Sequence, residues 1–195
     1  MVGVPVVLAS ASPRRAALLR QIGIPFEVIA ASVDETQLPG ESPSEYVQRL
    51  AQTKAKAVAC PDRVTLAADT IVVLDDVILG KPRDEQDSIE MLLSLGGRSH
   101  WVLTGVCVDN GITARTLSVS AEVDFKKLDR EEACAYVATG EGEDKAGGYG
   151  IQGIGGIFAE RIKGSYSAVV GLPLKETEEL LVEFGIDTWR YRCPR

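Results

Sequence analysis

Residues 4–15 read VPVVLASASPRR, and this stretch decides the fold that the rest of the chain is expected to complete. Its first six residues form a nearly continuous apolar run, which is typical of a strand covered on both faces. A polar turn follows, and Ser12 then precedes Pro13, an order favoured at a helix N-cap and first helical position. The stretch therefore predicts a buried strand that turns into a helix.

Further helices and strands are expected along the rest of the chain. Helical spacing and capping patterns predict helices over residues 44–59 and 84–95, from Asp129, and from Pro173 onward. Apolar runs predict strands over residues 26–30, 65–74, 77–79, 100–109, 115–125, 157–162 and 168–170. We therefore expect an α/β fold with a long twisted mixed sheet flanked by helices. Because no long linker interrupts the pattern, a single domain over residues 1–195 is predicted.

The composition limits the classes of function. The chain has 195 residues, of which 45% are hydrophobic and 25% charged, and its formal net charge is -7. This acidic balance repels polyanions, so we expect no nucleic-acid partner and expect local cations to hold any phosphate ligand. No run reaches the ~18 apolar residues of a membrane helix, and no secretory leader is recognisable. A cytoplasmic protein without a membrane partner is therefore predicted.

A candidate phosphate site lies at the predicted strand-to-helix junction. Two hydroxyls and two guanidinium groups gather there beside the amides of a helix start, a combination that suits a phosphate. These groups belong to Ser10, Ser12, Arg14 and Arg15. A well-capped helix with two solvated arginines explains the same residues equally well, and the motif matches neither a P-loop nor the dinucleotide-binding fingerprint.

Asp69 is the main candidate for a catalytic group. It lies between Ala68 and Thr70 in an apolar strand, where an ionised carboxylate is costly unless a cation, a metal or hydrogen bonds hold it. Glu35, in the loop after the second strand, adds another carboxylate, and Mg²⁺ prefers such oxygens when it also binds phosphate. An edge-strand aspartate in water and an ordinary polar loop are the alternative interpretations.

Weaker signals come from two lysines, a glycine-rich loop and a histidine. Lys54 and Lys81 are candidates to neutralise phosphate, although each alone is typical of a solvated surface lysine. Glycines surround Gln152 in residues 147–153, so the backbone there can approach a flat ligand while the amide pairs with a base edge. His100, the only histidine, has no recognisable nucleophile or metal ligand beside it, which favours packing over catalysis.

Together these motifs resemble the Maf-like nucleotide pyrophosphatases over nearly the whole chain. The resemblance rests on ASASPRR at residues 9–15, DET at 34–36, ADT at 68–70, GKP at 80–82, GIQG at 150–153, SY at 165–166 and VGLP at 170–173. It implies a fold similar to the inosine triphosphate pyrophosphatases, with two lobes and a substrate cleft. It also implies a divalent metal, Mg²⁺ or Mn²⁺, and a homodimer.

The resemblance further implies an activity and roles for individual residues. The sequence around Gln152 is similar to the branch that hydrolyses dTTP and UTP to the nucleoside monophosphate and pyrophosphate, a house-cleaning of nucleotide pools. Asp69 would then be the proton acceptor and, with Glu35, a metal ligand. Arg14, Thr70 and Gln152 would set substrate specificity. The remaining phosphate-binding residues would be Ser10, Ser12, Arg15, Lys54 and Lys81.

Two other functions stay open. One is a pyrophosphatase for 7-methyl-GTP or other modified nucleotides, although the methylated-purine branch lacks the sequence found around Gln152. The other is a non-catalytic, nucleotide-binding regulator of cell division, which has no need of a base such as Asp69 beside the polyphosphate.

Overall fold

The computed structural model describes residues 6–192, which form two compact units. Within that range, unit 1 comprises residues 6–69, 104–119 and 171–192, and unit 2 comprises residues 70–103 and 120–170. The sheet is mixed and has seven strands, in the order β2-β1-β3-β5-β6-β7 with β4 paired to β3. Helices flank it, so the predicted fold class is confirmed. None of the helices in the described range is long and apolar enough to cross a membrane.

The first strand and helix of unit 1 form as their sequence predicts. β1 (Val6–Leu8) is fully buried and pairs in parallel with β2 (Phe26–Val28) and β3 (Val64–Leu74). In α1 (Pro13–Gln21), the Ser12 side chain accepts a hydrogen bond from the Arg15 amide at 3.5 Å. Residues 4 and 5, the start of the predicted strand, lie outside the described residues.

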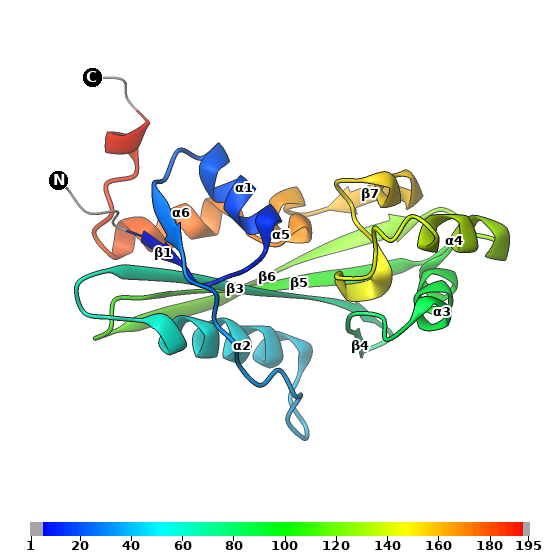
Figure 1. Ribbon diagram of the computed structural model, residues 1–195, viewed down its shortest axis with the longest axis horizontal. Helices are drawn as coiled ribbons and strands as arrows, with labels where there is room; N and C mark the ends of the chain where they lie inside the picture. The colour runs from blue at the N-terminus through cyan, green and yellow to red at the C-terminus, as the bar shows by residue number, and fades with distance from the viewer. Residues whose placement is uncertain (1–5, 193–195) are drawn as a thin grey trace. The chain divides into compact units, whose positions relative to one another are not determined.

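Small residues let α2 (Pro43–Val58) approach the unit 1 strands closely. A Cβ atom at Gly105 would lie 2.2 Å from the carbonyl oxygen of Val47, so only glycine fits there. The small-residue core around α2 consists of Ala9, Ala51, Ala55, Ala67 and Cys107. Figure 1 shows α2 on one side of these strands and α1 and α6 (Leu174–Glu183) on the other. The sheet in unit 1 is therefore covered on both faces.

Turns and caps shape the first part of unit 2. Asp75 and Asp76 both adopt left-handed backbone conformations, with φ of 50° and 64°, and turn β3 into the antiparallel β4 (Val77–Leu79). The Asp84 carboxylate then caps α3 (Glu85–Leu95) by accepting a hydrogen bond from the Asp87 amide at 2.8 Å. This helix packs against α4 (Arg130–Val137).

The second half of the sheet is built from β5 (Ser99–Asp109), β6 (Ala114–Phe125) and β7 (Ala159–Lys163). β5 and β6 meet at the predicted Asn110 turn, where Asn110 Oδ1 accepts hydrogen bonds from the amides of residues 112 and 113. β6 pairs in antiparallel fashion with β7. His100 is buried in an aromatic core, with its Nε2 atom 2.8 Å from Tyr149 Oη, so the expected packing role is confirmed.

The glycine-rich segment of unit 2 consists of turns and two 3₁₀ helices, η1 (Ala146–Gly148) and η2 (Ile154–Phe158). The strand predicted over residues 168–170 is wrong, because these residues belong to the helix α5 (Tyr166–Val170). Ser165 starts that helix, since its hydroxyl and carbonyl oxygens both accept a hydrogen bond from the Ala168 amide. A short apolar run fits a buried strand and a buried helix equally well. A last short 3₁₀ helix, η3 (Trp189–Tyr191), follows α6.

Candidate active site

Lys54 lies between two carboxylates in unit 1. Its Nζ atom is 2.5 Å from Asp69 Oδ1 and 2.6 Å from Glu35 Oε1. The side chains of Lys54 and Asp69 are each 11% exposed, whereas that of Glu35 is 51% exposed. α2 provides the lysine, β3 the aspartate and the loop after β2 the glutamate. Three predicted site residues from three separate segments are therefore brought together.

This arrangement accounts for an ionised group in the middle of an apolar strand. Asp69 is itself buried, as are Ala68 and Ile71 in β3, so its carboxylate has little water to solvate it. The Lys54 ammonium supplies the opposite charge at hydrogen-bonding distance, which offsets the cost of desolvation. The strand thus presents a carboxylate that is paired with a neighbouring cation.

The loop that carries Glu35 is fixed by two side chains from α2. Tyr46 Oη donates a hydrogen bond of 2.7 Å to the backbone oxygen of Glu35. Arg49 binds both carboxylate oxygens of Glu41 and donates to the Thr36 backbone oxygen at 3.1 Å. Burial, together with the charges of Asp69 and Glu35, raises the pKa of Tyr46.

Sequence reasoning missed Tyr46 and Arg49, which belong to no motif. The available signal was the spacing of Tyr46 and Lys54, which lie eight residues apart on a predicted helix and so on the same side of it.

The strand-to-helix junction lies in the same electrostatic neighbourhood. Ser10 Oγ accepts hydrogen bonds of 3.2 Å from the Ser12 amide and from Arg15 Nη1, and Arg15 Nε donates to the Gly171 backbone oxygen at 2.8 Å. Burial lowers the pKa of Arg15, the Asp69 charge opposes that change, and the Arg14 charge adds to it. The two serine hydroxyls still have protons to donate to a ligand. The junction thus offers hydrogen-bond donors and positive charge to an anionic ligand.

Three further predicted site residues, Thr70, Lys81 and Gln152, belong to unit 2. Thr70 is half-buried in β3, while Lys81 and Gln152 are exposed in turns. The Gly147 amide donates a hydrogen bond of 3.0 Å to the Gly80 oxygen, which places the glycine-rich segment beside the turn that carries Lys81. In unit 2, the turn that carries Lys81 therefore lies beside the part of the glycine-rich segment around Gly147.

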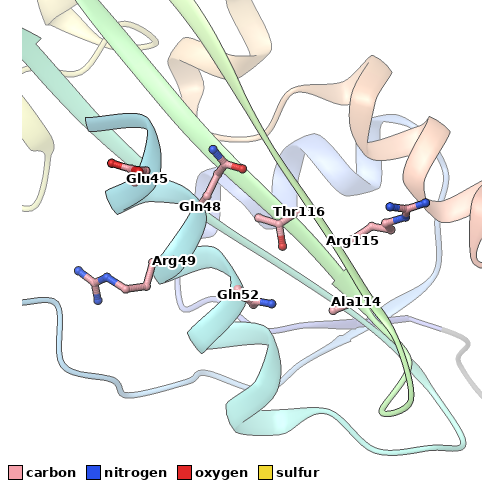
Figure 2. A pocket seen from close by; sticks show the side chains of 7 residues that line it. All are labelled: Glu45, Gln48, Arg49, Gln52, Ala114, Arg115 and Thr116. Atoms are coloured by element: carbon pink, nitrogen blue, oxygen red, sulfur yellow. The ribbon is translucent and has the colours of Figure 1, made fainter. Parts of the chain in front are cut away.

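A polar groove of about 410 Å³ also lies in unit 1 (Figure 2). It is lined by Glu45, Gln48, Arg49 and Gln52 from α2 and by Ala114, Arg115 and Thr116 from β6. Arg49 binds Glu41 and Arg115 binds Glu183, so both cations are already engaged in ion pairs. Since none of the predicted site residues lines the groove, it is separate from the candidate active site.

The carboxylates of Glu35 and Asp69 are suitable ligands for a divalent cation. Within residues 6–192, no three His, Cys, Asp or Glu side chains gather in a way that would hold a metal ion. Two carboxylates nevertheless converge on a single ammonium. Carboxylate oxygens completed by phosphate oxygens and water make the kind of ligand set that Mg²⁺ prefers. The donor set therefore fits a metal that is bound jointly with a phosphorylated substrate.

Comparison with known proteins identifies the family. The model of the family described as "Maf-like protein" matches residues 5–184. The chain belongs to the Maf-like family. Relatives of this Maf-like chain include the dTTP/UTP pyrophosphatase of Pseudoalteromonas atlantica, which is 50% identical over 186 residues, covering 92% of this chain and 97% of the relative. The dTTP/UTP pyrophosphatase of Vibrio cholerae is 52% identical over 182 residues, covering 91% and 97%.

Among solved structures, a HAM1 protein from Coxiella burnetii is similar to the Maf-like chain, with a TM-score of 0.49 and 15% sequence identity. The match covers 91% of this chain and 98% of that protein.

Proposed function

We propose that this Maf-like chain hydrolyses dTTP and UTP to the nucleoside monophosphate and pyrophosphate. The observation that carries the proposal is the buried Asp69 carboxylate, held by Lys54 beside Glu35. The sequence relationship supports the choice of substrate, since a relative named dTTP/UTP pyrophosphatase is 50% identical over 92% of the chain.

In the proposed reaction, Asp69 orients a water molecule and takes one of its protons. The water oxygen bonds to the α-phosphorus as the bond from that phosphorus to the bridging oxygen breaks. The electron pair of the broken bond leaves with pyrophosphate, and the nucleoside monophosphate remains. A positioned carboxylate that accepts a proton in this way contributes about 10²–10⁴-fold to a reaction rate.

Lys54 has two successive roles in this scheme. Before the substrate binds, its ammonium pairs with the carboxylates of Asp69 and Glu35. When phosphates arrive, Lys54 turns toward them, and the Asp69 carboxylate is left to face the water molecule. The stabilising cation is thereby converted into a phosphate ligand at the moment when a base is needed.

The charge of the polyphosphate is met by the other cations and donors. Arg14, Arg15 and Lys81 supply positive charge, and Ser10 and Ser12 donate hydroxyl protons. A divalent metal, Mg²⁺ or Mn²⁺, held by Glu35 and Asp69 would neutralise further charge and hold phosphate oxygens in place.

Base recognition falls to Arg14, Thr70 and Gln152. The Gln152 amide offers one donor group and one acceptor group, which complement the adjacent N–H and C=O groups that uracil and thymine share. Because its side chain is exposed on a glycine-rich loop, a flat base can reach it.

We further propose that residues 1–195 act as a single Maf-like domain, as a homodimer and in the cytosol. The domain and the dimer rest on the family resemblance, and the cytosolic location rests on the sequence. Analytical ultracentrifugation of the full chain tests the dimer directly, because a monomer at micromolar concentration would contradict it.

The activity is tested by measuring pyrophosphate release with Mg²⁺ or Mn²⁺ from dTTP, UTP, CTP, GTP, ITP and 7-methyl-GTP, with the nucleotide product identified. Pyrophosphate and monophosphate from dTTP and UTP alone are expected. A preference for 7-methyl-GTP would overturn the choice of substrate. Binding of nucleotides without any turnover would favour a regulatory protein over an enzyme.

A further inference from the structure

The carboxylate of Glu141 lies inside the glycine-rich segment of unit 2 and accepts three hydrogen bonds. Its Oε1 atom accepts from Tyr136 Oη at 2.9 Å and from the Gly155 amide at 2.9 Å, and its Oε2 atom accepts from the Ile154 amide at 2.8 Å. Tyr136 Oη in turn accepts a hydrogen bond of 2.9 Å from the Gly150 amide. Glu141 and Tyr136 together therefore hold three backbone amides, which we call the Glu141 clamp.

The Glu141 clamp brackets Gln152. One held amide lies two residues before Gln152, and the other two lie two and three residues after it. The Gln152 side chain itself is exposed. The loop thus presents a side chain to solvent from a backbone that is fixed on both sides.

The same carboxylate explains two of the glycines in the segment. A Cβ atom at Gly153 would lie 2.1 Å from Glu141 Oε2, and one at Gly150 would lie 2.9 Å from Glu141 Oε1. Neither distance is compatible with a larger residue while the carboxylate keeps its place. The glycines beside Gln152 therefore leave room for the clamp as well as for a ligand.

The protonation states suit these hydrogen bonds. Burial acts to raise the pKa of Glu141, but the hydrogen bonds from Gly155, Ile154 and Tyr136, together with the Lys145 charge, outweigh it, and the pKa lies below its ordinary value. Burial raises the pKa of Tyr136. At neutral pH the carboxylate is therefore ionised, and the phenol keeps the proton that it donates.

We propose that Glu141, supported by Tyr136, is a positioning residue that sets base selectivity by fixing the backbone on both sides of Gln152. The inference rests on the proposed function, in which Gln152 pairs with the base. A glutamine amide can turn over and exchange its donor and acceptor, so a loosely held Gln152 can pair with cytosine as well as with uracil or thymine. To pair with uracil or thymine and not with cytosine, the Gln152 side chain must extend from a backbone that is fixed in position.

The variant Glu141→Gln tests the clamp with little change of shape. Its amide group keeps one acceptor but turns an N–H group toward a backbone N–H, so at least one of the three hydrogen bonds is lost. The preference for α,β-methylene-dTTP over α,β-methylene-dCTP, measured as a ratio of Kd values, is expected to fall about tenfold. For the hydrolysable nucleotides, the change should appear in KM, with kcat for dTTP near that of the unaltered protein.

Hydrogen exchange of residues 150–155 provides a readout that is independent of catalysis, and it should become faster in Glu141→Gln. Glu143→Gln is the matched control, because Glu143 is an exposed carboxylate in the same turn and makes none of these hydrogen bonds to the loop. Its Kd ratio and exchange should equal those of the unaltered protein. Tyr136→Phe keeps the aromatic ring, whose centroid lies 5.0 Å from that of Phe158, and removes only the hydroxyl. It should change the Kd ratio and the hydrogen exchange in the same direction as Glu141→Gln.

The outcomes separate this inference from the proposed function. Selective binding of the dTTP analogue without turnover of dTTP would overturn the proposed activity and leave the clamp to be judged by the Kd ratio. An unchanged Kd ratio in Glu141→Gln, with faster exchange of the loop, would overturn the inference even in a fully active enzyme.

Discussion

A buried carboxylate, Asp69, and a partly buried one, Glu141, are stabilised in opposite ways. In unit 1, Asp69 is bound by the ammonium of a flexible lysine side chain. In unit 2, Glu141 is bound by two backbone amides and a buried phenol. A lysine can exchange one anion for another by rotating its side chain, whereas backbone amides cannot move without refolding the segment.

The two modes of stabilisation suit the two proposed roles, catalysis for Asp69 and base recognition for Glu141. A catalytic base must change its charge environment during the reaction, so a mobile counterion suits Asp69. A base-reading loop must keep its shape, so fixed amides suit Glu141. The predictions below test whether the two carboxylates divide the work in this way.

The largest effect is expected for Asp69→Asn. The amide preserves the shape of the side chain but cannot take a proton from water, so pyrophosphate release from dTTP should fall about 10³-fold. Affinity for α,β-methylene-dTTP, measured without Mg²⁺ or Mn²⁺, should stay within about threefold, because Arg14, Arg15 and Lys81 are unchanged. Isothermal titration and a pyrophosphate assay measure the two quantities.

Asp62→Asn, at an exposed position just before β3, is the control for this variant. It should retain full turnover. Full activity of Asp69→Asn would remove Asp69 from the mechanism and would break the proposed division between the two carboxylates.

A second prediction concerns pH, because the core of unit 2 contains a buried histidine. Burial lowers the pKa of His100 from 6.5 to about 4, so the unfolded chain binds this proton more readily than the folded one. Stability is therefore complete above pH 6.5 and is lost as the pH falls toward 4. The loss from this group should reach about 3 kcal/mol at pH 4 in urea unfolding.

His100→Gln separates this effect from acid titration elsewhere. The glutamine keeps a polar group near Tyr149 Oη but does not titrate, so its stability should fall less between pH 7 and pH 4. Parallel stability curves for the two proteins would contradict the prediction.

A smaller effect is expected from Lys54→Met, which leaves Asp69 and Glu35 facing each other without the cation. The free energy of unfolding should fall by about 2 kcal/mol, less than for a fully buried pair because Glu35 is half exposed. Mg²⁺ should restore part of the loss, since it would replace the missing charge. Urea unfolding with and without Mg²⁺ measures both changes.

Lys56→Met is the matched control, because Lys56 is exposed on the same helix. Neither its stability nor its response to Mg²⁺ should differ from that of the unaltered protein. If Mg²⁺ stabilised Lys54→Met no more than this control, the two carboxylates would not form a metal site.

Most of the fold could be predicted because its elements have local signals. Ser12 with Pro13 sets the start of α1, and Asp84 and Asp129 cap their helices as their sequences indicate. Residues 168–170 could not be assigned in this way, because the three apolar residues are too few to show a period. Their helix depends on hydrogen bonds to Ser165.

The site was predictable in its components but not in its pairings. The sequence indicates Asp69, Glu35 and Lys54 individually as candidate site residues. Their ion pairs, however, join segments whose proximity is set by the tertiary fold. Glu141 gave no signal, because a glutamate near a glycine-rich loop is ordinary in a sequence. Its role depends on the close approach of its carboxylate to the backbone of residues 150–155.

The overlap between Glu141 and a side chain at Gly153 also couples the two positions in any attempt to change the substrate. A Cβ atom at Gly153 would lie 2.1 Å from the carboxylate, so single substitutions there compete with the residue that supports the loop. In a mutant library that randomises only residues 150–153, most substitutions of Gly153 would therefore displace the Glu141 carboxylate from the loop. Variants with a new base preference should emerge when positions 141 and 153 are randomised together, because a shorter residue at one makes room for a larger residue at the other.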